Sequence, residues 1–293
     1  MVTEHDPARP SLRRRAAAGA RRSALAAFLL ALIAFLIDAH FIEPARLIAK
    51  HEQLEIPNWP APLGGLRVAL VSDLHVGSPH WGVPHLRELI ARVNAEHADL
   101  ILLAGDYLIH DVKFGTRVEP KIVAKELAAF RAPLGVAAVF GNHDGWHGGH
   151  GLRKHMEAGG IKVLDDQVLR IDTRGTSFAV LGLADEETRS LSPAQELALA
   201  PPGVPLLVLV HEPDVFPDLD ARVSLTLAGH THGGQVRLPL LGAPIVRSRF
   251  GQRFLGGHIV ENGRHLFVTT GVGTSVWPIR FGVTPEYVVL TLH

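Results

Sequence analysis

The sequence predicts an α/β domain with mixed β-sheets, preceded by one N-terminal membrane helix. Short apolar runs of strand length alternate with segments of helical spacing, which is typical of an α/β domain. Each of these runs ends in polar residues, as strands do where they enter a loop. An arginine-rich start followed by an apolar stretch predicts the helix. With 293 residues, 47% of them apolar, the chain is long enough for one large domain or two small ones.

The composition restricts the classes of site and partner. Cysteine is absent, so a metal must be held by histidine, carboxylate or amide oxygen. The whole chain is formally neutral, with 29 basic and 29 acidic residues. Residues 1–22 contain six arginines against two acidic residues, a charge of +4, so the remainder carries −4. A mildly acidic domain offers no basic face, and no nucleic-acid partner is expected.

Residues 1–22 form a basic N-terminal segment, and residues 23–42 form the predicted membrane helix. The uninterrupted apolar run, 24–37, has 14 residues, and its flanks extend it to 20 residues, roughly 30 Å as a helix. Three interpretations compete: an uncleaved anchor, a cleaved signal peptide, and a buried or interfacial helix. No A-x-A cleavage site follows the run, which favours the anchor. Arginines that stay in the cytoplasm predict a single-pass inner-membrane protein with an extracytoplasmic domain.

Residues 43–65 contain four prolines and are predicted to be a connector, with the folded domain spanning 66–293. Helical spacing predicts two helices, in 85–98 and 121–132. Apolar runs that end at polar residues predict strands within 66–75, 99–106, 135–144, 176–185, 205–214 and 223–232.

Five of the predicted strands are followed at once by side chains that can bind a metal ion. Because strand carboxyl ends line one edge of an open sheet, these side chains should meet at one site. The histidines of the last group are two residues apart, so they point to the same side. Each of these residues alone could be explained as a helix cap, a turn residue or a core residue. We do not expect all five groups to follow strands by chance. The groups are Asp73 with His75, Asp106, Asn142 with His143 and Asp144, His211, and His230 with His232.

Five ordered motifs carry a family resemblance. They are SDLH (72–75), GDY (105–107), GNHD (141–144), VHEPD (210–214) and GHTHGGQ (229–235). The chain resembles the calcineurin-like metallophosphoesterase family, and most of all its membrane-associated bacterial phosphodiesterase subgroup, whose ending is similar to residues 271–286. The resemblance covers about 66–292 and implies a sandwich of two mixed β-sheets flanked by helices.

The resemblance also implies a site for two divalent or trivalent metal ions. Asp73, His75 and His232 would hold the first ion, whereas Asn142, His211 and His230 would hold the second. Asp106 would bridge the two ions. Independently, four imidazoles with carboxylates and an amide oxygen suit Mn, Fe, Zn or Ni better than Mg, and Mn is favoured.

The implied reaction is attack on phosphorus by a water or hydroxide that bridges the ions. His143 would face the substrate as a catalytic residue, with Asp144 beside it. Trp146 and Arg280 are predicted to contact the substrate. Relatives usually carry a charged residue three positions after the bridging aspartate. Here Ile109 stands in that place.

The sequence therefore predicts a membrane-bound phosphohydrolase. A phosphodiesterase or pyrophosphohydrolase acting on a lipid-linked or envelope phosphate is favoured by the subgroup resemblance and by the anchor. Two alternatives stay open: a phosphomonoesterase or protein phosphatase of the same fold, and a non-catalytic metal-binding domain. The oligomeric state and the physiological substrate are not defined by the sequence.

Overall fold

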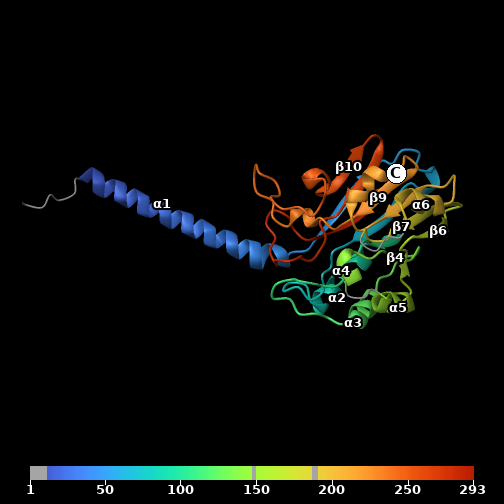
Figure 1. Cartoon of the computed structure of the whole chain (residues 1–293), viewed down its shortest axis with the longest axis horizontal. Coiled ribbons are helices and arrows are strands. Elements are labelled where there is room, and N and C mark those ends of the chain that lie inside the picture. Colours follow the sequence, from blue (N-terminus) through green and yellow to red (C-terminus); the bar gives the residue numbers. More distant parts are fainter. Residues whose placement is uncertain (1–11, 147–149, 187–190) are drawn as a thin grey trace, which may run out of the picture.

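A long N-terminal helix projects from the folded domain in the computed structural model (Figure 1). The structure describes residues 12–146, 150–186 and 191–293, and side chains within 19–145, 151–186 and 191–293. Helix α1 (Leu12–Ile37) continues as a π-helical turn (Asp38–Ile42) and a 3-10 turn (Glu43–Ala45). The second half of the predicted basic segment, 12–22, is thus helical too, because alanine and arginine are strong helix formers.

The span Gly19–Ala45 is long and apolar enough to cross a membrane, with a mean hydropathy of 2.4 over its most apolar window. Only 6% of that window is buried in the protein, so the helix does not belong to the domain core. Signal sequences share this length and composition, so the span agrees with either an anchor or a signal sequence.

Two six-stranded sheets, each with parallel and antiparallel pairs, pack face to face, as predicted. In spatial order the first contains β1 (Ile48–Leu54), β12 (Glu286–Leu292), β2 (Leu66–Val71), β3 (Leu100–Leu103), β4 (Val136–Ala138) and β5 (Lys162–Val163). The second contains β10 (Gly257–Glu261), β11 (Arg264–Val268), β9 (Val223–Ala228), β8 (Leu206–Leu209), β7 (Thr176–Gly182) and β6 (Gln167–Thr173).

Three apolar layers hold the sandwich together. Alternate strand residues such as Val68 and Leu70 meet Phe178 and Leu207 between the sheets. Helices cover the outer face of the first sheet: α2 (Val83–Ala95), α3 (Pro120–Leu127) and α5 (His150–Ala158) (Figure 1). The second sheet is covered by α6 (Pro193–Leu199) and the 3-10 helix Pro213–Asp218. Short helices elsewhere are α4 (Asn142–Trp146) and the 3-10 turns Ala61–Leu63, His232–Gly234 and Gly251–Phe254.

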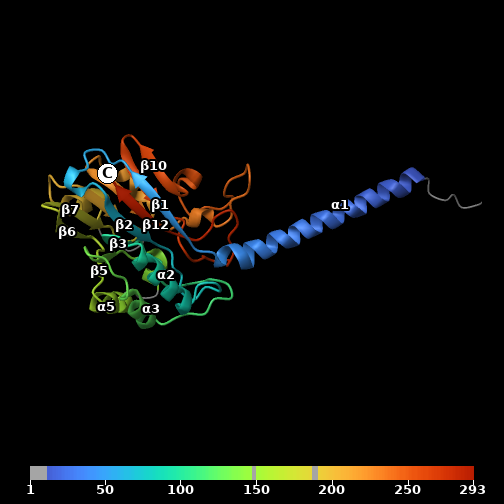
Figure 2. The same cartoon turned by 180° about the vertical axis from the view of Figure 1, so that it is seen from behind.

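The segment predicted as a connector, 43–65, differs from that expectation because it contributes a strand. β1 pairs in parallel with β12 along all seven of its residues, so it forms an edge of the first sheet (Figure 2). Its sequence, IAKHEQL, is mostly polar because this edge strand is largely solvent-accessible. The second predicted helix is also shorter than expected, since α3 ends at Leu127.

We expect Phe178→Ala to destabilise the domain strongly. Phe178 is fully buried between the sheets, and removing a buried aromatic ring typically costs about 3–5 kcal/mol. Denaturant unfolding of the full chain in detergent would measure this loss. Val260→Ala on the exposed face of β10 is the matched control and should change stability by less than about 0.5 kcal/mol. Equal stability of the two variants would contradict the described core.

Candidate metal centre

The predicted metal-binding side chains lie where the carboxyl ends of both sheets meet. In the first sheet, Asp73 and His75 follow β2, Asp106 follows β3, and Asn142 follows β4. In the second, His211 follows β8, and the His230/His232 pair follows β9. The strands β2, β3 and β4 are parallel, as are β8 and β9, so these ends point to a common edge.

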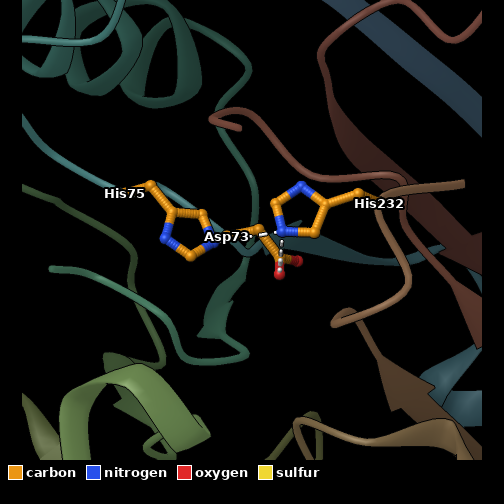
Figure 3. A group of neighbouring side chains, drawn as sticks. All are labelled: Asp73, His75 and His232. Atoms are coloured by element: carbon orange, nitrogen blue, oxygen red, sulfur yellow. Dashed lines mark hydrogen bonds and ion pairs between the residues drawn. The ribbon is translucent and has the colours of Figure 1, made fainter. Parts of the chain in front are cut away.

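Asp73, His75 and His232 form the first cluster of donor atoms (Figure 3). The Nε2 atoms of the two histidines lie 3.1 Å apart, and Nε2 of His232 lies 3.3 Å from Oδ1 of Asp73. Two donors bound to one ion at about 2.1 Å stand roughly 3.0–3.4 Å apart. The spacing of these atoms therefore fits a metal ion.

Asp106 connects this cluster with a second group of donors. Its Oδ2 atom lies 3.5 Å from Nε2 of His75 and 3.2 Å from Nε2 of His211. His211 and His230 also share a cluster with Glu212, and Asp73, Asp106 and His211 form a third. Oδ1 of Asn142 is buried and has no hydrogen-bond partner among the residues that the structure describes, which is the state of an amide oxygen kept for another ligand.

Backbone strain is concentrated at these residues. A positive φ angle is rare outside glycine and costs energy unless the surroundings enforce it. Five predicted ligands adopt it: Asp73 (55°), His75 (40°), Asp106 (56°), His230 (68°) and His232 (50°). The strands therefore deliver these side chains through sharp left-handed turns at the sheet edge.

Two glycines allow the backbone to approach the ligands closely. A Cβ atom on Gly229 would lie 2.1 Å from Oγ of Ser72 and 2.5 Å from Oδ2 of Asp73. A Cβ atom on Gly141 would come within 2.4 Å of Oδ1 of Asp106. Gly229 is therefore required because no side chain fits there. Gly233 and Gly234, which follow His232, have the positive φ angles of a turn.

Burial keeps most of the site histidines neutral. It lowers the pKa of His75 and of His230 to about 3 and that of His232 well below its usual range. For His211 burial acts in the same direction, but the adjacent Asp106 carboxylate outweighs it and raises the pKa. Neutral imidazole is the form that binds metal, so the low pKa values prepare the site for ligation.

The second ring nitrogens of two site histidines have neighbours that orient the rings. Nδ1 of His211 lies 2.6 Å from the carbonyl oxygen of Ala104, and Nδ1 of His232 lies 3.3 Å from Nη2 of Arg280. Arg280 is fully buried, and its guanidinium donates to carbonyl oxygens of residues 270, 271, 273 and 283. It therefore lies behind His232 rather than at an exposed surface where a substrate would arrive.

The two predicted catalytic residues occupy different environments. The ring of His143 is buried 4.8 Å from that of His75, and the backbone N–H of His143 donates to Oδ1 of Asp106. Asp144 is fully buried beneath the site. Its carboxylate accepts N–H groups of residues 106, 107, 108 and 141 at 2.8–3.2 Å. Asp144 thus holds the turn that carries Asp106.

Ile109, in the place of the usual charged residue, is buried, and its Cδ1 atom packs close to Gly77 and Gly115. The next residue, His110, lies with its ring 6.2 Å from that of His143, edge to face. Nε2 of His110 is 3.3 Å from Oδ2 of Asp111. A polar pair therefore lies beside His143 although the usual position is apolar.

Two more residues lie near the predicted ligands in the sequence, Glu212 and Trp146. Glu212 is not among the residues predicted from the sequence, although it directly follows His211 in the VHEPD motif. It is buried next to Asp185, and burial raises its pKa. Trp146 ends α4, and its side chain lies outside the part of the chain that the structure describes.

An apolar pocket of about 410 Å³ adjoins the predicted ligands His230 and His232. Its far walls consist largely of apolar side chains, including Ile245, Trp277 and Ile279. Gln235 holds one wall in place, because its side-chain amide bonds to both N–H and C=O of Ser275. The pocket can therefore bind an apolar group next to the reacting centre.

A two-sheet sandwich with histidine and aspartate ligands at its strand ends defines the metallophosphoesterase class of hydrolase. The model of the calcineurin-like phosphoesterase family matches residues 66–234, more than half of the chain. The chain belongs to this family and is a metallophosphoesterase.

Similar proteins occur in bacteria. An uncharacterized metallophosphoesterase of Bacillus subtilis, YkuE, is 29% identical over 87% of this chain and 88% of its own length. The phosphodiesterase YaeI of Escherichia coli is 31% identical over 86% of this chain and 91% of its own length. Among solved structures, an archaeal phosphodiesterase aligns with 69% of this chain and 82% of its own at 15% identity and a TM-score of 0.35.

We expect Gly229→Ala to weaken metal binding. The added methyl group would displace Ser72 or Asp73, and overpacking of this kind costs about 1–3 kcal/mol, equivalent to roughly 5- to 150-fold if it all falls on affinity. Metal content after dialysis, measured by mass spectrometry, checks this. Gly151→Ala in α5, where a Cβ would meet no atom within 4 Å, is the matched control. Full metal content in Gly229→Ala would refute the close-packing argument.

Proposed function

We propose that this protein is a two-metal phosphodiesterase or pyrophosphohydrolase that acts on a lipid-linked or envelope phosphoester. The observation that carries the proposal is the convergence of His75, His232 and Asp73 with Asp106 and His211 through atoms 3.1–3.5 Å apart. Membership of the phosphoesterase family supplies the reaction class. The diester preference is supported by the similarity to a named phosphodiesterase.

The proposed ligands divide into two sets around Asp106. Asp73, His75 and His232 hold one ion, and Asn142, His211 and His230 hold the other, with Glu212 within reach of the second set. The mixture of imidazoles, carboxylates and an amide oxygen favours Mn, Fe, Zn or Ni, and we favour Mn. Bound ions would lower the pKa of a water molecule and neutralise charge on the phosphoryl oxygens.

His143 is proposed to stabilise or protonate the leaving oxygen. Its ring lies beside His75 at the first cluster, which brings it within reach of a phosphoester held there. A well-placed proton donor contributes roughly 10²–10⁴ in rate. The neighbouring His110 and Asp111 give this ring polar support that Ile109 does not supply.

We further propose a positioning role for Asp144 and Arg280. Both are fully buried and bonded mainly to backbone groups, so each acts on the reaction through the ligand that it holds. Asp144 fixes the turn of Asp106, and Arg280 fixes His232. Trp146, beside the catalytic motif, stays a proposed substrate contact.

A lipid-linked substrate is supported by the apolar pocket that adjoins His230 and His232. A hydrocarbon or other apolar portion can lie there while the phosphate reaches the metal ligands. The proposed location is the inner membrane, with α1 as an uncleaved single-pass anchor and the domain outside the cytoplasm, because the arginines precede the apolar run.

We expect the full chain, stripped of metal, to regain cleavage of a chromogenic phosphodiester when Mn is restored. Asp106→Asn should lose both metal content and activity, because Asp106 lies between the two clusters. His143→Ala should keep its metal content and lose roughly 10²–10⁴ in turnover.

The same assay tests the alternatives. Faster cleavage of the matched monoester would favour a phosphomonoesterase. Tight metal binding without turnover of either ester would favour a non-catalytic domain. The exposed Glu88→Gln in α2 is the control and should behave as the unaltered protein.

Asp144→Asn should reduce stability and metal content together. In asparagine an NH₂ group replaces one carboxylate oxygen, so it would face backbone N–H donors with no acceptor between them. Each unsatisfied buried group costs about 1–3 kcal/mol. Denaturant unfolding and metal analysis measure both effects. Asp172→Asn, at an exposed position in β6, is the control. A stable, metal-loaded but inactive Asp144→Asn protein would show instead that Asp144 acts directly in catalysis.

A further inference from the structure

Several hydrogen bonds join the end of α1, and the turns that follow it, to the domain. The N–H of Arg280 donates to the carbonyl oxygen of Ala39 at 2.9 Å, and Nε1 of Trp81 donates to that of Pro44 at 3.1 Å. The buried Glu43 carboxylate accepts the N–H of Gly282 at 2.8 Å and the Thr284 hydroxyl at 3.2 Å. These contacts fix the direction in which the domain faces relative to the helix axis.

The domain also contacts α1 inside its apolar run. The rings of Phe35 and Phe281 lie edge to face with centroids 4.6 Å apart. Phe35 precedes Asp38, the first charged residue after the run, by three residues, or about 4.5 Å along a helix. If α1 crosses the bilayer, Phe281 must therefore lie at the level of the bilayer surface.

The most exposed apolar side chains of the domain lie around this junction. We compared the large apolar side chains that the structure describes beyond residue 42. The four with the highest exposed fractions are Leu240 (106%), Phe114 (80%), Ile245 (77%) and Leu241 (72%). They belong to two loops, 109–118 and 236–248. Monomeric domains rarely gather such residues on one face without a partner.

Hydrogen bonds tie these loops to the segment that holds α1. The N–H of Lys113 donates to the carbonyl oxygen of Val276 at 2.9 Å, and that of Arg237 donates to Phe281 at 2.7 Å. In both views the orange loop 236–248 and the green loop 109–118 lie on the side of the domain from which α1 leaves (Figures 1 and 2). The loops and the helix therefore share one face.

We propose that loops 109–118 and 236–248, with Trp277 between them, form a membrane-docking surface that inserts into the interface of an anionic phospholipid bilayer. The charges fit this partner: the loops contain Lys113, Arg117, Arg237 and Arg247 against a single acidic residue, Asp111. Half-exposed tryptophan is typical of the level of the lipid headgroups.

Docking would place the mouth of the catalytic pocket against the bilayer. Ile245 and Trp277 belong both to the exposed surface and to the wall of the pocket that ends at His230 and His232. An apolar chain could then pass from the bilayer into the pocket without crossing water. The inference rests on the proposed function in one respect, that α1 is a membrane anchor.

The absence of cysteine allows a direct test on the full chain. Single variants Leu240→Cys and Phe114→Cys, labelled with an environment-sensitive fluorophore, are reconstituted in vesicles of phosphatidylglycerol and phosphatidylethanolamine. We expect the fluorophore emission at both positions to shift to the blue. We also expect it to be quenched by lipids that carry a doxyl group near the headgroup. Leu199→Cys, exposed on α6 at the far end of the domain, is the matched control and should stay unquenched.

Leu29→Cys in the apolar run, measured with a lipid that carries its doxyl group deep in the acyl chain, separates failure of this inference from failure of the anchor. Quenching at residue 29 without quenching at 240 and 114 would overturn the docking surface and leave the anchor intact. Absence of quenching at all three sites would overturn both. A blue shift that depends on protein density but not on lipid would assign the surface to a contact between copies of the chain and overturn the proposal. Loss of the residue-114 signal in the added variant Leu240→Asp would support joint insertion of the loops.

Discussion

The site depends on one constraint: a carboxylate, Asp106, is held fully buried where the ends of the two sheets meet. Its Oδ2 atom is shared between His75 and His211, and its Oδ1 atom accepts the backbone N–H of His143. A buried negative charge is costly unless opposite charges or donors surround it. Histidines, strained turns and close-packed glycines gather around this group, and bound cations would complete its compensation.

The sequence was sufficient to predict the alternation of strands and helices and the meeting of ligands at one edge. Both follow from local signals, since apolar runs such as LRVALV end one or two residues before a predicted ligand, here Asp73. It was not sufficient for β1, because IAKHEQL is polar and becomes a strand only by pairing with β12, more than two hundred residues away. Long-range pairing of this kind leaves no periodic signal in the chain.

The positions of Asp144 and Arg280 could not be read from the sequence for a related reason. A charged residue within a motif is expected to contact substrate, yet both side chains are saturated by backbone groups. The Asp144 carboxylate collects four N–H donors from two turns, and Arg280 donates to four carbonyl oxygens. Such contacts depend on where loops from different strands meet, and Glu212 beside His211 was missed for the same reason.

The hydrogen-bonded junction fixes how α1 is oriented relative to the site. A helix joined through a flexible linker would hold the domain near a membrane in any orientation. Here Ala39 and Glu43 are hydrogen-bonded to residues 280 and 282, in the segment that also contains the pocket residues Trp277 and Ile279 and Arg280 behind His232. If α1 is the membrane anchor proposed above, the membrane normal also fixes the direction from which a substrate would reach the proposed ligands. Under that proposal α1, the pocket and the proposed ligands act as one unit, so a change at the junction would alter access to the site without touching a ligand.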